Sequence, residues 1–125
     1  MTDADRENGG LCFDSWHFTR STNNLDDLRA LPGEKVVATQ WNDGPVKAPH
    51  SNTAQEYLDD CLTNRVLPGE GEFALVEMAR ILDAIGSTAP IGVEICSADL
   101  WAAPVDYAAT ASAEAMQCVL TTARS

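Results

Sequence analysis

The chain has 125 residues, enough for one domain with a hydrophobic core and too few for two domains of ordinary size. Hydrophobic residues make up 45% and charged residues 22%, which excludes a disordered or low-complexity chain. Nineteen acidic residues outnumber eight lysines and arginines, giving a net charge of -11. That charge repels phosphate backbones and anionic lipids, so neither nucleic acid nor a membrane surface is expected as a partner.

The amino-terminal segment, residues 1–10, is polar and acidic, unlike the basic and then apolar start of a signal peptide. No stretch approaches the roughly 18 uninterrupted apolar residues of a membrane span. The four cysteines lie far apart and form no C-x-x-C pair. These features predict a soluble, reduced protein of the cytoplasm.

The first part of the chain predicts two strands joined by a short helix. Residues 11–14 are short and apolar after a Gly-Gly pair, which indicates a buried strand. Asn23 or Asn24 can cap the helix, and a Pro-Gly pair stops it near Leu31. Residues 35–41 are rich in β-branched side chains and end at the turn sequence N-D-G-P, as expected of a second strand.

The second part begins with a long polar connection in which residues 53–62 are a possible helix and residues 65–67 a very short strand. Helical spacing of apolar residues predicts a helix over 73–85. A strand over 90–96 and an alanine-rich helix over 104–123 follow. Alternating strands and helices, with nearly continuous apolar strands, predict an α/β fold with a parallel sheet.

The three main strands share an alternation of side chains. Asp14, Gln40 and Glu94 fall on one face together with small residues, and bulky apolar residues fall on the other. Each polar residue lies at or near the carboxyl end of its strand. Parallel α/β sheets and barrels place their ligand sites at that end.

Glu94 is the most informative single residue because it interrupts an apolar run. A carboxylate in an apolar interior requires a partner, which would be a metal ion, an arginine or a proton held by a shifted pKa. The alternatives without function are a glutamate facing solvent from a half-exposed strand and a buried ion pair.

Other polar residues have both a functional and a structural interpretation. Asp14 and His17, in D-S-W-H, suit a divalent cation, although such a sequence also fits a turn with a capping aspartate. Gln40 offers a carbonyl oxygen to a hard cation, or is simply buried and hydrogen-bonded. Arg65 precedes P-G-E-G-E and is suited to a phosphate or carboxylate, or else to a nearby surface acid. His50, in the polar connection, is expected to be solvated.

Trp16 and Trp41 either wall a sugar site or belong to the core. The sequence contains no G-x-S-x-G, P-loop or G-x-G-x-x-G motif. Serine hydrolysis, nucleoside-triphosphate chemistry and dinucleotide binding therefore have no support.

Four segments together resemble a known family: L-C-F-D-S-W-H-F, V-A-T-Q-W-N-D-G-P, R-V-L-P-G-E-G-E-F and I-G-V-E-I. Their order and intervals are similar to the carboxyl-terminal half of the xylose-isomerase-like TIM barrels, the sugar-phosphate isomerase and epimerase superfamily. The resemblance implies that residues 11–125 form part of a TIM-barrel domain with about four parallel strands, the fifth to the eighth, and outer helices. Residues 65–67 would be the seventh strand.

The resemblance also implies a site for a divalent metal, which could be Mn, Mg, Co or Zn. Asp14, Gln40 and Glu94 would be metal ligands, with Gln40 at a position that is histidine in many relatives. Glu94 and His17 would be catalytic, and Arg65 and His17 would bind the substrate. The implied reaction moves a proton on a sugar or sugar phosphate, as in an isomerase or epimerase.

Length sets a condition on this function, because a complete (β/α)₈ barrel needs about 250 residues. A half-barrel leaves two sheet edges and an inner face uncovered. We therefore expect a fragment that needs another chain or self-association. The alternatives are a noncatalytic α/β interaction module and a lyase or dehydratase on the same barrel.

Overall fold

The computed structural model describes residues 6, 8–48 and 53–125. The polar amino-terminal segment is therefore described only in part, and His50 lies outside the described residues. The strands are β1 (Leu11–Asp14), β2 (Val36–Trp41) and β3 (Ile91–Val93). The helices are α1 (Ser15–Ser21), α2 (Leu25–Arg29), α3 (Ala54–Thr63), α4 (Leu75–Ala84), α5 (Ala98–Ala102) and α6 (Val105–Ala123).

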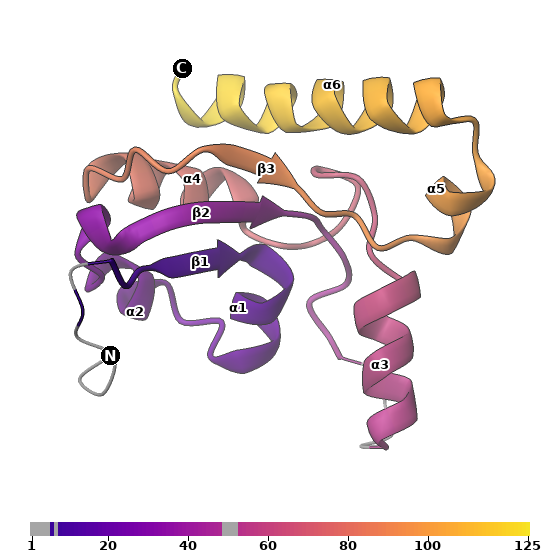
Figure 1. The fold of residues 1–125 in the computed structure, drawn as a ribbon, viewed down its shortest axis with the longest axis horizontal. Helices are drawn as coiled ribbons and strands as arrows, with labels where there is room; N and C mark the ends of the chain where they lie inside the picture. Colours follow the sequence, from indigo (N-terminus) through magenta and orange to yellow (C-terminus); the bar gives the residue numbers. More distant parts are fainter. Residues whose placement is uncertain (1–5, 7, 49–52) are drawn as a thin grey trace.

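The three strands form one parallel sheet in the order β1-β2-β3, which confirms the predicted α/β class (Figure 1). Asp14 lies opposite Gln40 in the register, and Gln40 lies opposite Gly92. The backbone N–H of Glu94 donates to the Trp41 carbonyl at 3.0 Å. The polar residues predicted to share a face are therefore side by side at the carboxyl ends of the strands.

The predicted seventh strand is absent from the sheet in the described part of the chain. Val66 forms a single antiparallel bridge with Asp43, and β3 pairs directly with β2. The backbone N–H of Arg65 instead donates to the Cys96 carbonyl. Arg65 and Val66 thus form hydrogen bonds to two different segments, and Pro68 has no backbone N–H with which to continue a ladder, so no strand forms here. The observed strand β3 (Ile91–Val93) is also shorter than the strand predicted over 90–96.

Two short helices, α1 and α5, were not predicted, because each begins directly after extended chain without a turn sequence. Asp14 caps α1 and Ser97 caps α5. The predicted helices are confirmed: Asn24 caps α2, and Thr53 caps α3. Their short polar side chains accept backbone N–H groups that the first helical turn leaves unpaired.

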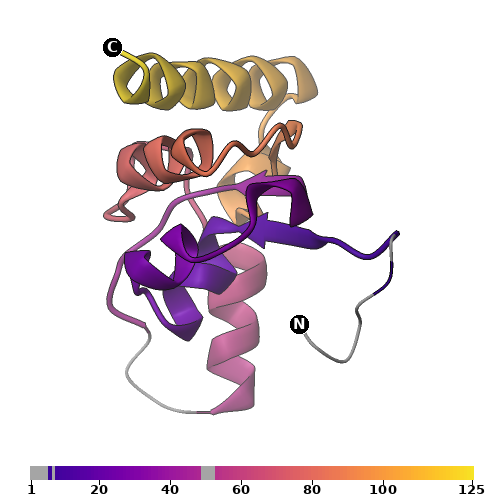
Figure 2. The same ribbon diagram turned by 90° about the vertical axis from the view of Figure 1, so that its left-hand side faces the viewer.

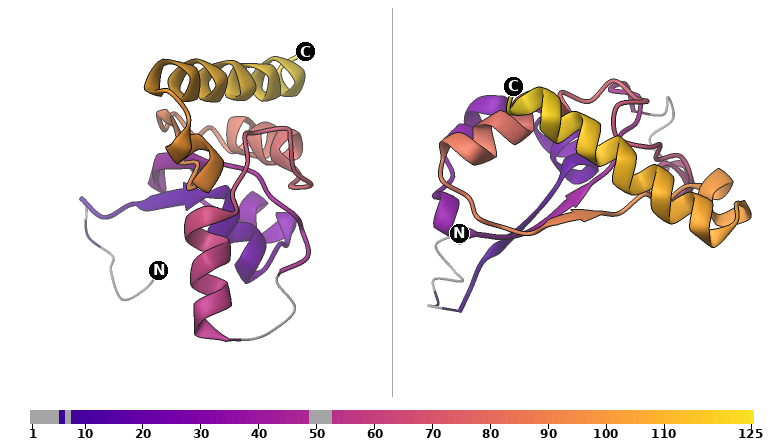
Figure 3. Two further views of the ribbon diagram at one scale, coloured as in Figure 1. Left: turned by 90° about the vertical axis from the view of Figure 1, so that its right-hand side faces the viewer. Right: turned by 90° about the horizontal axis from the view of Figure 1, so that it is seen from above.

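The core lies between the sheet and α2, α4 and α6. Figures 2 and 3 show α4 and α6 stacked on one side of the sheet. Phe13 and Trp41 are buried on that side as the alternation predicts, and Met78 of α4 is fully buried. Val37 departs from the prediction and is 54% exposed, because the register shifts between Leu11 and Cys12.

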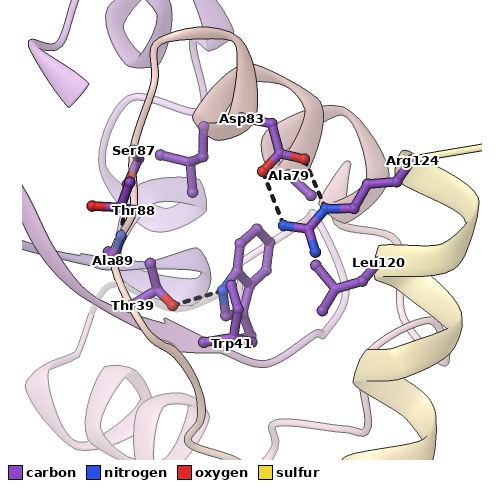
Figure 4. Close-up of a pocket in the computed structure, with 11 residues that line it drawn as sticks. Thr39, Trp41, Ala79, Asp83, Ser87, Thr88, Ala89, Leu120 and Arg124 are labelled. Atoms are coloured by element: carbon purple, nitrogen blue, oxygen red, sulfur yellow. Dashed lines mark hydrogen bonds and ion pairs between the residues drawn. The ribbon is translucent and has the colours of Figure 1, made fainter. Parts of the chain in front are cut away.

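A cavity of about 220 Å³ remains in this layer, between β2, α4 and α6 (Figure 4). Asp83 and Arg124 close its rim through two hydrogen bonds of 2.9 Å. Inside, the Trp41 indole N–H donates to the Thr39 hydroxyl at 2.9 Å. The cavity lies on the opposite face of the sheet from Gln40, so it belongs to the packing between sheet and helices.

The other face of the sheet is open. Cys12 is exposed, and Ala38, Gln40 and Gly92 are half-buried. Within the described ranges, no helix is long and apolar enough to cross a membrane.

Candidate functional site

Four of the predicted site residues meet at the carboxyl ends of the strands. Asp14 ends β1, Gln40 lies in β2, and Glu94 directly follows β3. The fourth, Arg65, reaches the cluster from the segment after α3, which Figure 1 shows beyond the strand ends. The parallel sheet brings the first three together, whereas the loop after α3 delivers the arginine.

Asp14 is 6% exposed, and both of its carboxylate oxygens are occupied. Oδ1 accepts the backbone N–H groups of Trp16 at 2.8 Å and His17 at 2.9 Å. Oδ2 lies 3.3 Å from Nη1 of Arg65. Asp14 is therefore a helix cap, as the alternative interpretation proposed, and at the same time one half of a buried ion pair.

Glu94 has the partner that its sequence position required. Its Oε2 lies 3.2 Å from Nη1 of Arg65, and its Oε1 accepts Nε2 of Gln40 at 2.8 Å. The side chain remains 42% exposed. The residue therefore combines a fixed orientation with access from solvent, a combination that proton exchange with a bound molecule requires.

Arg65 is fixed in place by several contacts, and its side chain is 2% exposed. Nε donates to the Cys61 carbonyl at 2.8 Å, and Nη2 lies 3.3 Å from the Cys61 sulfur. The guanidinium stacks on the Trp16 ring at 5.2 Å. Burial works to lower the pKa of Arg65, but the Cys61 hydrogen bond and the charge of Asp14 outweigh it, and the pKa is raised.

His17 lies at the margin of the cluster. It is exposed on α1, its ring packs edge-on against Trp16 at 4.9 Å, and its backbone N–H bonds to Asp14. The side chain lines a cavity of about 440 Å³ beside β1 that Asp14 also lines. Helix α1 thus places His17 beside the site, where its side chain is accessible to a bound molecule.

The donor set suits a hard divalent cation in part. Two carboxylates and one amide converge, and oxygen ligands are those that such cations take. In the described segments, however, no group of three or more His, Cys, Asp and Glu side chains is placed to hold a metal. Nη1 of Arg65 lies within salt-bridge distance of both Asp14 and Glu94, so a single positive charge is shared by the two carboxylates. The residues of this chain could therefore supply some, but not all, of the ligands of a metal ion.

Two neighbouring thiols are poor thiolate ligands. Partial desolvation raises the pKa of Cys12 although the residue is exposed, and the charges of Asp14 and Glu94 add to the effect. Burial also raises the pKa of Cys96, and the nearby positive charge of Arg65 only partly offsets this. Both thiols therefore stay protonated near neutral pH.

The sequence did not indicate the buried residues whose hydrogen bonds fix the site residues in place. Asn42 is fully buried, and its backbone N–H donates to the Ser15 hydroxyl at 2.9 Å. That hydroxyl donates in turn to the Asn42 carbonyl at 2.7 Å. The Asn42 amide also points at Asp14. These contacts fix the start of α1 against the end of β2, so that Asp14 keeps its orientation.

Asp43 was treated only as part of a turn, yet it organises the loop that carries Arg65. It is 1% exposed and accepts the backbone N–H groups of Gly44, Gly69 and Phe73 at 2.8 to 2.9 Å. A Cβ atom on Gly71 would lie 2.3 Å from Oδ1 of Asp43. The signal in the sequence was the pair D-G-P and P-G-x-G, whose glycines permit this close approach.

Asp60 and Arg20 form a second buried ion pair, at 2.7 Å, that the sequence did not indicate. Asp60 also accepts the Trp16 indole N–H at 3.2 Å, and Arg20 lies over the Trp16 ring. Trp16 and Trp41 are 1% and 0% exposed, so both belong to the core. The role of Trp16 in the site is to support the Arg65 guanidinium.

No family model matches the sequence. Among curated proteins, the chain is 31% identical over 101 residues to a 3-dehydroshikimate dehydratase of Pseudomonas aeruginosa. That match covers 81% of this chain and 15% of the relative. An inosose isomerase of Bacillus licheniformis is 30% identical over 92 residues, which cover 74% of this chain and 30% of the relative. The chain thus spans less than a third of either relative.

The comparison with solved structures identifies the fold. The IolI protein with a binding zinc atom matches with a TM-score of 0.81 and 22% identity, over 96% of this chain and 40% of its own. A xylose isomerase domain protein from Alicyclobacillus acidocaldarius matches with a TM-score of 0.67 and 27% identity, over 95% of this chain and 39% of its own.

The chain has the fold of part of a xylose-isomerase-like TIM barrel. A fusion protein described as a xylose isomerase-like TIM barrel joined to a 4-hydroxyphenylpyruvate dioxygenase also matches, with a TM-score of 0.77 and 24% identity. It is covered over 18% of its length, and this chain over 94%. The resemblance seen in the sequence is therefore confirmed, as is the prediction of a partial barrel.

Proposed function

We propose that this chain is the carboxyl-terminal part of a divalent-metal-dependent sugar isomerase or epimerase. The observation that carries the proposal is the convergence of Asp14, Gln40 and Glu94 at the carboxyl ends of three parallel strands. Ligand sites of TIM barrels lie at that end. The similarity to an inosose isomerase and to a zinc-containing structure of the same fold supports it.

In this proposal Asp14, Gln40 and Glu94 hold the metal, which is Mn, Mg, Co or Zn. When bound, the metal polarises substrate oxygens and stabilises the negative charge that develops on proton removal. Glu94 is the group that exchanges the substrate proton, because it is the only one of the two carboxylates with substantial exposure. His17 meets the substrate from the rim of the site.

Arg65 has a double role in the proposal. Its Nη1 now lies between the two carboxylates that would bind the cation. Two positive charges so close together repel, so a cation held by Asp14 and Glu94 would displace this nitrogen and leave it free to meet the substrate. Nε keeps its bond to the Cys61 carbonyl as a pivot. A sugar phosphate or another anionic substrate is then the natural partner of the guanidinium.

A dehydratase is the second candidate, and the identity of 31% to a 3-dehydroshikimate dehydratase favours it. Elimination of water needs the same polarised oxygen and the same proton acceptor as isomerisation. Assay of both reactions, after assembly with the missing barrel units, separates the two enzymes. A noncatalytic module would bind a partner chain without any response to metal.

The test is the melting temperature of the chain with and without Mn²⁺ and Mg²⁺. A ligand present at 100 times its Kd stabilises the folded state by about 2.7 kcal/mol, which raises the Tm by several degrees. Glu94→Gln should abolish the rise. Glu70→Gln, which changes an exposed glutamate outside the cluster, is the matched control and should keep it. An equal response in both variants, or none in the unmodified chain, contradicts the proposal.

A further inference from the structure

The guanidinium of Arg65 lies at the centre of the cluster. Its Nη1 is 3.3 Å from Oδ2 of Asp14, 3.2 Å from Oε2 of Glu94 and 3.3 Å from the Glu94 carbonyl oxygen. Two carboxylates and one guanidinium leave a single negative charge in excess. A divalent cation added to this set would turn the excess into a single positive charge, so the cation and the guanidinium compete for the same two carboxylates.

Arg65 is also anchored away from solvent. Its side chain is 2% exposed, its Nε donates to the Cys61 carbonyl, and its guanidinium stacks on the Trp16 ring. The ring is fixed in turn, because its indole N–H donates to Asp60 and the Arg20 guanidinium lies over it at 5.6 Å. These contacts restrict Arg65 to small movements within the site.

A cation that binds alone therefore carries a penalty. It takes the counterions of Arg65 and leaves a positive charge buried without a partner, which is strongly unfavourable. An oxyanion that reaches the guanidinium removes this penalty by supplying a new counterion. The side chain of Glu94, which contacts Nη1, is 42% exposed, so a solute can approach this ion pair from solvent.

We propose that the cation and an oxyanion bind to this site cooperatively, and that Arg65 couples them. The inference rests on the proposed metal site and adds how its occupancy is controlled. The cation binds weakly until an anionic group of the substrate draws Arg65 from Asp14 and Glu94. Coupling between two ligands is reciprocal, so the cation raises the affinity for the anion by the same factor.

The coupling also defines the substrate class. A neutral sugar leaves the displaced guanidinium without a counterion, whereas the carboxylate of a sugar acid or the phosphate of a sugar phosphate pairs with it through parallel hydrogen bonds. Anionic substrates are therefore favoured by the same residue that opposes the binding of metal in their absence.

The experiment measures the Kd for Mn²⁺ from the electron paramagnetic resonance signal of the free ion. Each titration is carried out in sodium sulfate and in sodium chloride at equal ionic strength, so that charge screening is the same. The chains are the unmodified protein, Arg65→Met and Arg29→Met. Arg29 is the matched control, because its side chain is 47% exposed and pairs with Asp26 and Glu77 outside the cluster.

Arg65→Met removes the charge and keeps a long side chain beside the Trp16 ring. Arg65→Gln is a second neutral variant that retains a donor for the carboxylates, and it replaces Arg65→Met where circular dichroism shows that the latter does not fold. Both are compared with the unmodified chain in each salt.

We expect sulfate to lower the Kd of the unmodified chain and of Arg29→Met by about tenfold or more, which is about 1.4 kcal/mol of coupling. In chloride, a neutral Arg65 variant should bind Mn²⁺ about tenfold more tightly than the unmodified chain, and sulfate should change its Kd by less than about twofold. An arginine with a purely structural role would give the opposite sign, because its loss would loosen the site and weaken metal binding.

Two results overturn this inference and leave the proposed metal site standing. One is a Kd of the unmodified chain that is the same in sulfate and in chloride. The other is a sulfate effect that persists unchanged in a neutral Arg65 variant. The absence of Mn²⁺ binding by every chain in both salts overturns the inference together with the proposed function.

Discussion

Asp43→Asn is the sharpest test of how the Arg65 loop is held. The carboxylate accepts three backbone N–H groups, from Gly44, Gly69 and Phe73. An asparagine can keep its oxygen toward Gly44 and Phe73, which share Oδ1. Its NH₂ group then faces the Gly69 N–H, which now lies 2.9 Å from Oδ2, so two donors confront each other.

The expected loss in the free energy of unfolding follows from these three hydrogen bonds. Hydrogen bonds to a charged group contribute about 1 kcal/mol more than neutral ones, so the two retained bonds lose about 2 kcal/mol together. The donor of Gly69 loses its acceptor, which costs about 1 kcal/mol more because that glycine has access to solvent. We therefore expect the free energy of unfolding to fall by about 3 kcal/mol and the Tm by on the order of 10 °C.

Urea unfolding monitored by circular dichroism and by tryptophan fluorescence measures this change. Asp59→Asn is the matched control, because Asp59 is exposed and, among the described residues, its carboxylate accepts a hydrogen bond only from the Gln55 side chain on its own helix. It should change the free energy of unfolding by less than about 0.5 kcal/mol. A loss below about 1 kcal/mol for Asp43→Asn would refute the claim that this carboxylate organises the loop.

Two further predictions concern packing and pH. A Cβ atom at Gly33 would lie 2.1 Å from the Ile85 carbonyl oxygen, so Gly33→Ala should destabilise the chain by about 1 to 3 kcal/mol and lower its urea midpoint. The hydrogen bond from Arg124 holds the pKa of Asp83 below its ordinary value near 3.9. Its contribution to stability is therefore present above about pH 4 and is lost as the pH falls through the lowered pKa. Asp83→Asn should be less stable than the unmodified chain at pH 7 and equally stable near pH 2, and a difference that stays constant with pH would contradict this linkage.

Sequence patterns alone predicted the fold class and the face of the sheet that carries the polar residues. Alternation along a strand has a period of two, so the placement of Asp14, Gln40 and Glu94 on one face follows from counting once the strands are recognised. The helices were predicted from different signals: a polar cap and a Pro-Gly stop for α2, the helical spacing of apolar residues for α4, and a proline followed by an alanine-rich stretch for α6. Helices α1 and α5 were missed because their caps directly follow extended chain.

The partner of each buried charge could be read only from the three-dimensional fold. The sequence required a partner for Glu94 but left metal, arginine and proton open, and only the packing of the loop after α3 places Arg65 between Glu94 and Asp14. Likewise Asp43 has its acceptors filled by groups up to 30 residues away. Local patterns arise from neighbouring residues, whereas the compensation of a buried charge depends on which distant segment the fold brings to it. For that reason the three strands of the sheet could be predicted from the sequence, whereas the predicted strand over 65–67 was wrong and the network that holds the site could not be predicted.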